Sequence, residues 1–212
     1  MKPKNVVVLD YGAGNIHSIV HALETIGTNV NLSKEPQDIL KADGLMVPGV
    51  GAFGEVMRAL NASGAPRWIG QRIAGNRPVM GICAGHQIFY EHGVEHGDHA
   101  EGLDEWPGVV EKLDSPTLPH MGWNHVQTAE GSRMFEGVED ERFYFVHSYA
   151  VQKWDFEVGS PKIRPPLVSW ANHGTDFIAA IENGPLWSAQ FHPEKSGQAG
   201  LQILRNWVNT LP

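Results

Sequence analysis

Short apolar runs alternate with stretches of helical periodicity through the first half of the chain. Residues 6–9 read Val-Val-Val-Leu, a continuous β-branched run typical of a strand buried on both faces of a parallel sheet. Apolar positions then recur at helical spacing over residues 16–26, and Gly27 is expected to end that helix. The same alternation predicts strands at 28–32, 45–47 and 78–82, and helices after Pro36 and at 53–60, 66–74 and 84–90. Strand–helix alternation with right-handed crossovers predicts an α/β fold with a doubly wound, mostly parallel sheet.

The second half changes character, because strand-like segments follow one another without helices between them. Turn residues separate predicted strands at 123–127, 142–152, 167–171, 177–181 and 186–191. A final amphipathic helix is expected at 200–208. We therefore expect an antiparallel β section beside the parallel sheet, with residues 1–212 forming a single domain.

Composition narrows the class of protein. Of 212 residues, 42% are hydrophobic, and 16 basic against 24 acidic residues give a net charge of −8. An acidic chain without a basic stripe argues against nucleic acid or an anionic membrane as a partner. No apolar stretch approaches the ~20 residues of a membrane helix, and the first apolar run is too short for a signal peptide. A single cysteine excludes an intramolecular disulfide or a multi-cysteine zinc site and favours a reducing, cytoplasmic location.

That cysteine, Cys83, lies in the pattern Gly81-Ile82-Cys83-Ala84-Gly85 at a predicted strand-to-helix junction. A nucleophile there sits on a sharp turn at the carboxyl edge of the sheet, and the flanking glycines permit the tight backbone. The helix expected at 84–90 would direct its N–H groups at the sulfur, favouring the thiolate and stabilising an oxyanion. A lone cysteine can also be a small buried hydrophobe, but the glycine-flanked turn after a buried strand favours a nucleophile.

His192 and Glu194 are the best candidates for the groups that assist the thiol. His192 directly follows a predicted strand, and side chains two positions apart on extended chain point to the same side. Glu194 would then orient the imidazole and stabilise its charged form. His-Pro-Glu alone is a weak motif, but with Cys83 it predicts a catalytic triad.

The glycine-rich segment 48–53 follows another central strand, so we expect it beside the Cys83 turn. Backbone N–H groups at Gly49 and Val50 would complete an oxyanion hole with that of Ala84. The alternative is an ordinary βα loop. A phosphate-binding P-loop is excluded because no Lys-Ser/Thr follows.

Two other motifs resemble binding sites, one for a dinucleotide cofactor and one for a metal ion. Gly12-Ala13-Gly14 follows the first strand, but His17 stands where a dinucleotide-binding fingerprint needs its third glycine. We therefore expect no cofactor and a turn that positions Asn15.

His92, His96 and His99 are spaced like metal ligands on a helix. Gly93 and Gly97 interrupt any helix that would align them, so a solvated loop without a metal is expected.

Taken together, the segments 81–87 (Gly-Ile-Cys-Ala-Gly-His-Gln) and 191–196 (Phe-His-Pro-Glu-Lys-Ser) resemble the signature pair of class I, triad-type glutamine amidotransferases. More narrowly, segments 10–15, 48–53, 119–124 and 144–149 resemble the glutaminase subunits of imidazole glycerol phosphate synthases. The resemblance extends from about Val6 to the final helix. The first two motifs are typical of the superfamily, whereas Pro-His-Met-Gly-Trp-Asn and Phe-Val-His-Ser-Tyr narrow it to these subunits.

The resemblance implies that L-glutamine is the substrate. Cys83 would attack its side-chain amide, with His192 shuttling protons and Glu194 orienting it, to give a γ-glutamyl thioester, ammonia and then glutamate. Gln87 and Glu95 match positions that hold the amino-acid end of the substrate, assisted by the backbone around Ser148 and Tyr149. Gly49, Val50 and Ala84 match the oxyanion segment. His120 and His147 lie inside matching motifs and are expected to have packing or hydrogen-bonding roles.

The resemblance also implies a partner. Ammonia would pass to a (β/α)₈-barrel cyclase subunit, which forms imidazole glycerol phosphate and an aminoimidazole carboxamide ribotide in histidine biosynthesis. Asn15, Trp123, Tyr144 and Lys195 match positions on the docking face of such a heterodimer. With seven Trp in a small chain, we expect some to be exposed, and exposed aromatic residues favour a protein–protein interface.

Two departures and three alternatives accompany this interpretation. His86 stands where the family usually carries methionine, so a second imidazole lies three residues from Cys83 and could perturb it. Segment 102–108 is also less apolar than is common. The alternatives are a paralogous glutaminase that feeds another synthase, and a stand-alone cysteine-elbow peptidase or deglycase, which the complete His-Pro-Glu and docking-face segments disfavour. An intact triad likewise disfavours a non-enzymatic docking module.

Overall fold

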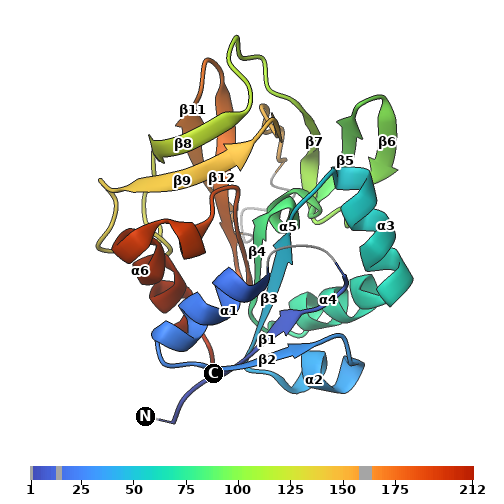
Figure 1. Ribbon diagram of the computed structural model, residues 1–212, viewed down its shortest axis with the longest axis vertical. Helices are drawn as coiled ribbons and strands as arrows, with labels where there is room; N and C mark the ends of the chain where they lie inside the picture. The colour runs from blue at the N-terminus through green and yellow to red at the C-terminus, as the bar shows by residue number, and fades with distance from the viewer. Residues whose placement is uncertain (1, 13–15, 158–163) are drawn as a thin grey trace.

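The computed structural model describes residues 2–12, 16–157 and 164–212. Its centre is a seven-stranded sheet of order β11-β12-β13-β4-β3-β1-β2 (Figure 1). The parallel strands are β1 (Asn5–Leu9), β2 (Asn29–Ser33), β3 (Gly44–Gly49), β4 (Val79–Cys83) and β13 (Leu186–Ala189). β12 (Asp176–Asn183) pairs antiparallel with β13, and β11 (Leu167–Asn172) pairs antiparallel with β12. This is the expected α/β sheet with its antiparallel section.

Helices cover both faces of the main sheet. α1 (Ile16–Thr25) and α6 (Gly197–Val208) pack on one face, and α2 (Pro36–Lys41), α3 (Phe53–Ser63) and α4 (Ala65–Ala74) pack on the other (Figure 1). Successive residues of β1 alternate between the two cores, with Val6 and Val8 in one and Val7 and Leu9 in the other. A strand with two buried faces needs apolar side chains at every position, which explains the continuous run. No helix in the described ranges is long and apolar enough to cross a membrane.

Two smaller sheets lie near the end of the main sheet at which the parallel strands finish (Figure 1). One has the order β10-β7-β5-β6 and consists of β5 (Tyr90–Glu95), β6 (Asp98–Glu101), β7 (Trp106–Lys112) and β10 (Tyr149–Ala150). The other pairs β8 (His120–His125) antiparallel with β9 (Arg142–His147). The predicted strand at 142–152 is therefore interrupted at Ser148 and divided between two sheets.

The helix predicted at 84–90 was wrong in extent. α5 spans only Ala84–Gln87, and Tyr90 begins β5 instead. The carbonyl of Ile88 accepts the N–H of Leu103 at 2.7 Å, and the carbonyl of Phe89 accepts that of Glu105 at 2.9 Å. Long-range pairing of the chain with the segment before β7 therefore replaces the helical hydrogen bonds.

The loop expected around the three spaced histidines was also wrong, because it is a β-hairpin. His92 lies in β5, His99 in β6, and His96 at the turn between them, with a φ of 51°. Gly93 lies so close to α3 that a Cβ there would be 2.4 Å from the Phe53 ring. This glycine therefore permits close strand-to-helix packing rather than a loop.

Candidate active site

Cys83 occupies a strained turn between β4 and α5. It is the last residue of β4 and has φ 57° and ψ −116°, a conformation that non-glycine residues rarely adopt. A Cβ at Gly85 would lie 2.0 Å from the carbonyl oxygen of Val47, and one at Gly81 would lie 2.2 Å from that of Gly85. The two glycines around Cys83 are therefore required by close backbone approach, and the predicted sharp turn is confirmed. The helix that follows is a single turn, so its dipole is weaker than the expected seven-residue helix would supply.

The glycine-rich segment after β3 lies against this turn, as predicted. Gly49 is in register with Cys83 across the β3–β4 pair. A Cβ at Gly49 would lie 2.4 Å from the backbone nitrogen of Gly85 and 2.8 Å from the carbonyl carbon of Ala84. The next residue, Val50, is 41% exposed. The backbones of the three predicted oxyanion residues are thus brought to one edge of the sheet.

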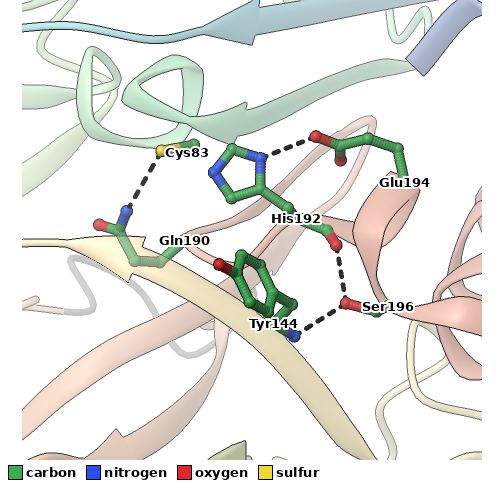
Figure 2. A network of polar contacts seen from close by, with 6 residues as sticks. All are labelled: Cys83, Tyr144, Gln190, His192, Glu194 and Ser196. Atoms are coloured by element: carbon green, nitrogen blue, oxygen red, sulfur yellow. Dashed lines mark hydrogen bonds and ion pairs between the residues drawn. The ribbon is translucent and has the colours of Figure 1, made fainter. Parts of the chain in front are cut away.

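His192 lies beside Cys83 and is held by Glu194. The Nδ1 atom of His192 is 2.7 Å from Oε1 of Glu194, and both side chains are buried. Figure 2 shows the other ring nitrogen, Nε2, facing the sulfur of Cys83, and this atom has no further partner among the described residues. Burial lowers the pKa of His192, but the contacts with Cys83 and Glu194 outweigh it and raise the pKa from 6.5 to about 10. The imidazole is therefore fixed in orientation and holds its proton at neutral pH.

A backbone frame supports His192 from β9. The hydroxyl of Ser196 donates to the carbonyl of His192 at 2.7 Å and accepts the N–H of Tyr144 at 2.9 Å (Figure 2). The N–H of His192 in turn donates to the carbonyl of Tyr144 at 2.9 Å. The 3-10 turn η1 (Pro193–Lys195), which carries Glu194, is therefore anchored to the β8–β9 hairpin. No role was predicted for Ser196 from the sequence, although it is the last residue of the quoted segment 191–196, two positions after Glu194.

Gln190 is a second buried residue that sequence reasoning missed. Its Nε2 atom donates to the sulfur of Cys83 at 3.9 Å, and its Oε1 atom accepts from Gln87 at 2.9 Å. Gln87 also donates to the carbonyl of Tyr149 at 2.8 Å, so its amide nitrogen is engaged within the protein. The two-residue period that points to His192 and Glu194 also includes Gln190 and would have found it.

The other predicted substrate-binding residues line one pocket. Glu95, Ser148 and Tyr149 border a cavity of about 430 Å³ together with His96, Lys112, Leu118 and Pro119. Oε2 of Glu95 accepts the backbone N–H of Phe53 at 2.8 Å, which orients the carboxylate. Because Tyr149 contacts Gln87, which contacts Gln190, this pocket is connected to Cys83 through two side chains.

A larger cavity of about 740 Å³ lies elsewhere and contains none of the predicted site residues. Its lining includes Asn76 and Pro78, which come just before β4, together with Arg133 and Trp187. Cys83 is at the opposite end of the same strand. This cavity is therefore separate from the candidate active site.

The predicted docking residues include an exposed aromatic pair. Trp123 is 51% exposed, and its ring centroid is 6.1 Å from that of Tyr144, its partner across the hairpin. Met121, on the same strand, is 61% exposed, and Lys195 is exposed on η1. We call Met121, Trp123 and Tyr144 the hairpin patch. The fourth predicted docking residue, Asn15, lies outside the described residues.

His86 makes its contacts away from the sulfur. Its Nδ1 atom is 2.6 Å from the Ser188 hydroxyl, and its Nε2 atom is 3.2 Å from the Tyr90 hydroxyl. The side chain is fully buried, and burial lowers its pKa from 6.5 to about 3. His86 is therefore a neutral core residue, and its hydrogen bonds do not support the suggested perturbation of Cys83.

Comparison with known proteins agrees with this geometry. The family described as "Glutamine amidotransferase class-I" matches residues 7–211. The chain is 59% identical to "Imidazole glycerol phosphate synthase subunit HisH" of Renibacterium salmoninarum, over 98% of this chain and 94% of that protein. It is 56% identical to the protein of the same name from Thermobifida fusca, over the full length of both.

Solved structures share the fold at low identity. "Structure of PurLQS from Thermotoga maritima" matches with a TM-score of 0.72 at 19% identity and covers 99% of both chains. A crystal structure of another glutamine amidotransferase matches with a TM-score of 0.72 at 16% identity, over 96% of this chain and 97% of that one.

Proposed function

This chain belongs to the class I glutamine amidotransferase family, and from that premise we propose how Cys83, His192 and Glu194 carry its reaction. The chain is the glutaminase subunit of imidazole glycerol phosphate synthase in histidine biosynthesis, as its full-length relatives at 51–59% identity indicate. The observation that supports the proposed triad is the imidazole of His192, hydrogen-bonded to Glu194 on one side and facing Cys83 on the other. A thiol, a base and an orienting carboxylate in this order are what acyl transfer through a thioester requires.

In the first half-reaction, the thiolate of Cys83 attacks the side-chain amide carbon of glutamine. Electrons move to the amide oxygen, and the backbone N–H groups of Val50 and Ala84 are proposed to stabilise the resulting oxyanion. His192 then gives its proton to the nitrogen as the carbon–nitrogen bond breaks. The products are a γ-glutamyl thioester on Cys83 and ammonia.

In the second half-reaction, a water molecule attacks the thioester. Now neutral, His192 takes a proton from the water, and Glu194 stabilises the imidazolium that forms. Cleavage of the carbon–sulfur bond releases glutamate and regenerates the thiolate. Because Nδ1 is fixed on Glu194, the same Nε2 atom serves both proton transfers.

Recognition of glutamine is proposed to lie in the pocket beside Tyr149. The carboxylate of Glu95 has the charge that complements an α-ammonium group, and the Ser148–Tyr149 backbone forms another part of the wall. Gln87 supports this wall through the carbonyl of Tyr149 and leaves its own side-chain oxygen for the substrate.

The ammonia is proposed to be consumed by a (β/α)₈-barrel cyclase subunit that docks on the hairpin patch and Lys195. The exposed side chains of Trp123 and Met121 support this docking proposal. The Tyr144–His192–Ser196 hydrogen bonds join β9 of the same hairpin to η1, which carries Glu194. The free thiol of Cys83 and the biosynthetic role suit the cytoplasm.

Glutamate release from glutamine tests the proposal, with the purified chain assayed alone and with the cyclase subunit plus its nucleotide substrate. In Cys83→Ala, kcat is expected to fall at least about 10³-fold because the nucleophile is gone. The unfolding temperature is expected to equal that of wild type because the fold is kept. Retained glutamate release by this variant would contradict the mechanism. Glutamine-dependent turnover of the cyclase substrate separates this function from a paralogous glutaminase, and hydrolysis of a peptide instead of glutamine would indicate a peptidase.

A further inference from the structure

Two buried histidines link the β8–β9 hairpin to the wall of the glutamine pocket. The side-chain amide nitrogen of Asn124 lies 3.2 Å from Nε2 of His120. Nδ1 of His120 lies 2.9 Å from Nε2 of His147, and Nδ1 of His147 lies 3.0 Å from the carbonyl oxygen of Tyr149. These contacts form an unbroken chain, the histidine ladder: Asn124, His120, His147 and the Tyr149 carbonyl.

The partners at its two ends fix the direction of every hydrogen bond. A carbonyl oxygen only accepts, so Nδ1 of His147 carries the proton and donates to Tyr149. A neutral His147 then accepts at Nε2, which requires that Nδ1 of His120 donates. Nε2 of His120 is in turn an acceptor and receives an N–H of Asn124, whose other N–H donates to the carbonyl of Asn172 at 2.8 Å.

The surroundings of the ladder favour this neutral state. Both imidazoles are buried and contact Phe145 and Phe177, and His173 stacks on His120 at 4.2 Å. Burial lowers the pKa of His120 to about 4 and that of His147 to about 3, despite the Tyr149 carbonyl that favours the charged form of His147. Neither group is used in the triad chemistry.

The histidine ladder and the hydrogen bonds that lead to Cys83 meet at the carbonyl of Tyr149. The carbonyl of Tyr149 accepts from both His147 and Gln87, so its orientation is set from two sides. Gln87 is bonded to Gln190, which contacts the sulfur of Cys83. At the other end, Asn124 is the neighbour of Trp123 in the hairpin patch.

We propose that His120 and His147 are positioning residues for glutamine binding. They fix the orientation of the Tyr149 carbonyl and of the adjoining pocket wall, and this orientation depends on the position of the β8–β9 hairpin. His120 acts by setting the tautomer of His147: without its donated proton, His147 can carry its own proton on Nε2 and present a lone pair to the carbonyl. This inference rests on the proposed function, because it concerns the same glutamine site.

The test compares His120→Asn with His120→Gln in the complex with the cyclase subunit. An asparagine amide lies near the position of Nδ1 and keeps the donation to His147, whereas a glutamine amide reaches the position of Nε2 and loses it. The KM for glutamine is expected to rise about fivefold in His120→Gln, the effect of one lost neutral hydrogen bond, and to stay within about twofold of wild type in His120→Asn. The matched control is His173→Gln, which changes the stacked imidazole outside the ladder and is expected to leave KM unchanged.

Equal KM values in the two His120 variants, or an equal rise in the His173→Gln control, would overturn the inference and leave a packing role only. Both His120 variants are polar and close in size, so a general loss of folding would affect them alike and appear in the unfolding temperature rather than in KM. If the wild-type complex hydrolyses glutamine and only the KM difference is missing, the ladder fails and the proposed function stands. If the wild type does not hydrolyse glutamine, both fail.

Discussion

Gly49 is the position at which the smallest change should disturb the oxyanion segment most. In Gly49→Ala the added Cβ would lie 2.4 Å from the backbone nitrogen of Gly85, 2.8 Å from the carbonyl carbon of Ala84 and 2.9 Å from its Cβ. Ordinary contacts begin at 3.4 Å, so the two segments must separate by about 1 Å. None of these atoms belongs to the end of a flexible side chain, so the backbone itself must move.

The expected cost falls on catalysis more than on folding. A misplacement of about 1 Å in reacting groups can lower rates about 10²-fold, and one lost oxyanion donor costs about 10²–10³-fold. Overpacking of this size typically lowers the free energy of unfolding by about 1–3 kcal/mol. We therefore expect kcat/KM for glutamine to fall at least about 10²-fold in the complex with the cyclase subunit, while the chain still folds.

Gly70→Ala is the matched control. Gly70 lies in α4, and a Cβ there would meet nothing within 4 Å. Alanine should stabilise that helix by up to about 1 kcal/mol and leave kcat/KM unchanged. Steady-state glutamate release and thermal unfolding are measured for both variants. A Gly49→Ala enzyme within about threefold of wild-type kcat/KM would refute the proposed oxyanion role of the segment that contacts the Cys83 turn.

Three further predictions concern other parts of the site. Because Glu194 helps to raise the pKa of His192 to about 10, His192 keeps its proton below that pH and loses it above. Glu194→Gln should lower this pKa and move the alkaline fall of the pH–rate profile to lower pH, whereas an unmoved profile would count against the triad. His86→Met removes two buried hydrogen bonds and should lower the free energy of unfolding by about 1–3 kcal/mol in urea titrations, with kcat within about threefold of wild type; a large loss of kcat would restore the suggested link between His86 and Cys83. Trp123→Ala should weaken binding of the cyclase subunit by about tenfold or more in titration calorimetry. The control Leu32→Ala, at a residue 47% exposed on the edge strand β2, should not weaken it, and equal affinities of the two variants would argue against docking on the hairpin patch.

The parallel half of the sheet could be predicted because its strands are buried on both faces. A run such as residues 6–9 has no polar position, and the helices between such strands carry clear periodicity and end at glycines such as Gly27. The same reasoning failed after Cys83. Local pattern favours a helix to residue 90, but β5 pairs with β6 and β7, and the pair Gly93–Val110 is 17 positions apart in the chain. Periodicity does not detect pairing at that distance.

The identities of the catalytic residues could be predicted from the sequence, but most of the hydrogen bonds that connect the site could not. The sequence motifs identified Cys83, His192 and Glu194, and the pairing of β4 with β13 brings their segments side by side. Gln190 was overlooked because an amide is a weaker indicator of catalysis than a thiol, an imidazole or a carboxylate, although the two-residue spacing includes it. The histidine ladder needed the register of β8 and β9, where His120 lies directly opposite His147. The local sequence of either strand does not indicate that pairing.

In the proposed reaction, glutamine is hydrolysed through a thioester on Cys83, with His192 as the proton carrier. Intact-protein and peptide mass spectrometry after acid quenching of the turning-over complex tests it most directly. We predict a mass increase of one γ-glutamyl group on the peptide that contains Cys83, absent in Cys83→Ala and dependent on glutamine. Steady glutamate release without any adduct on that peptide, or with the adduct on another residue, would contradict a thioester on Cys83.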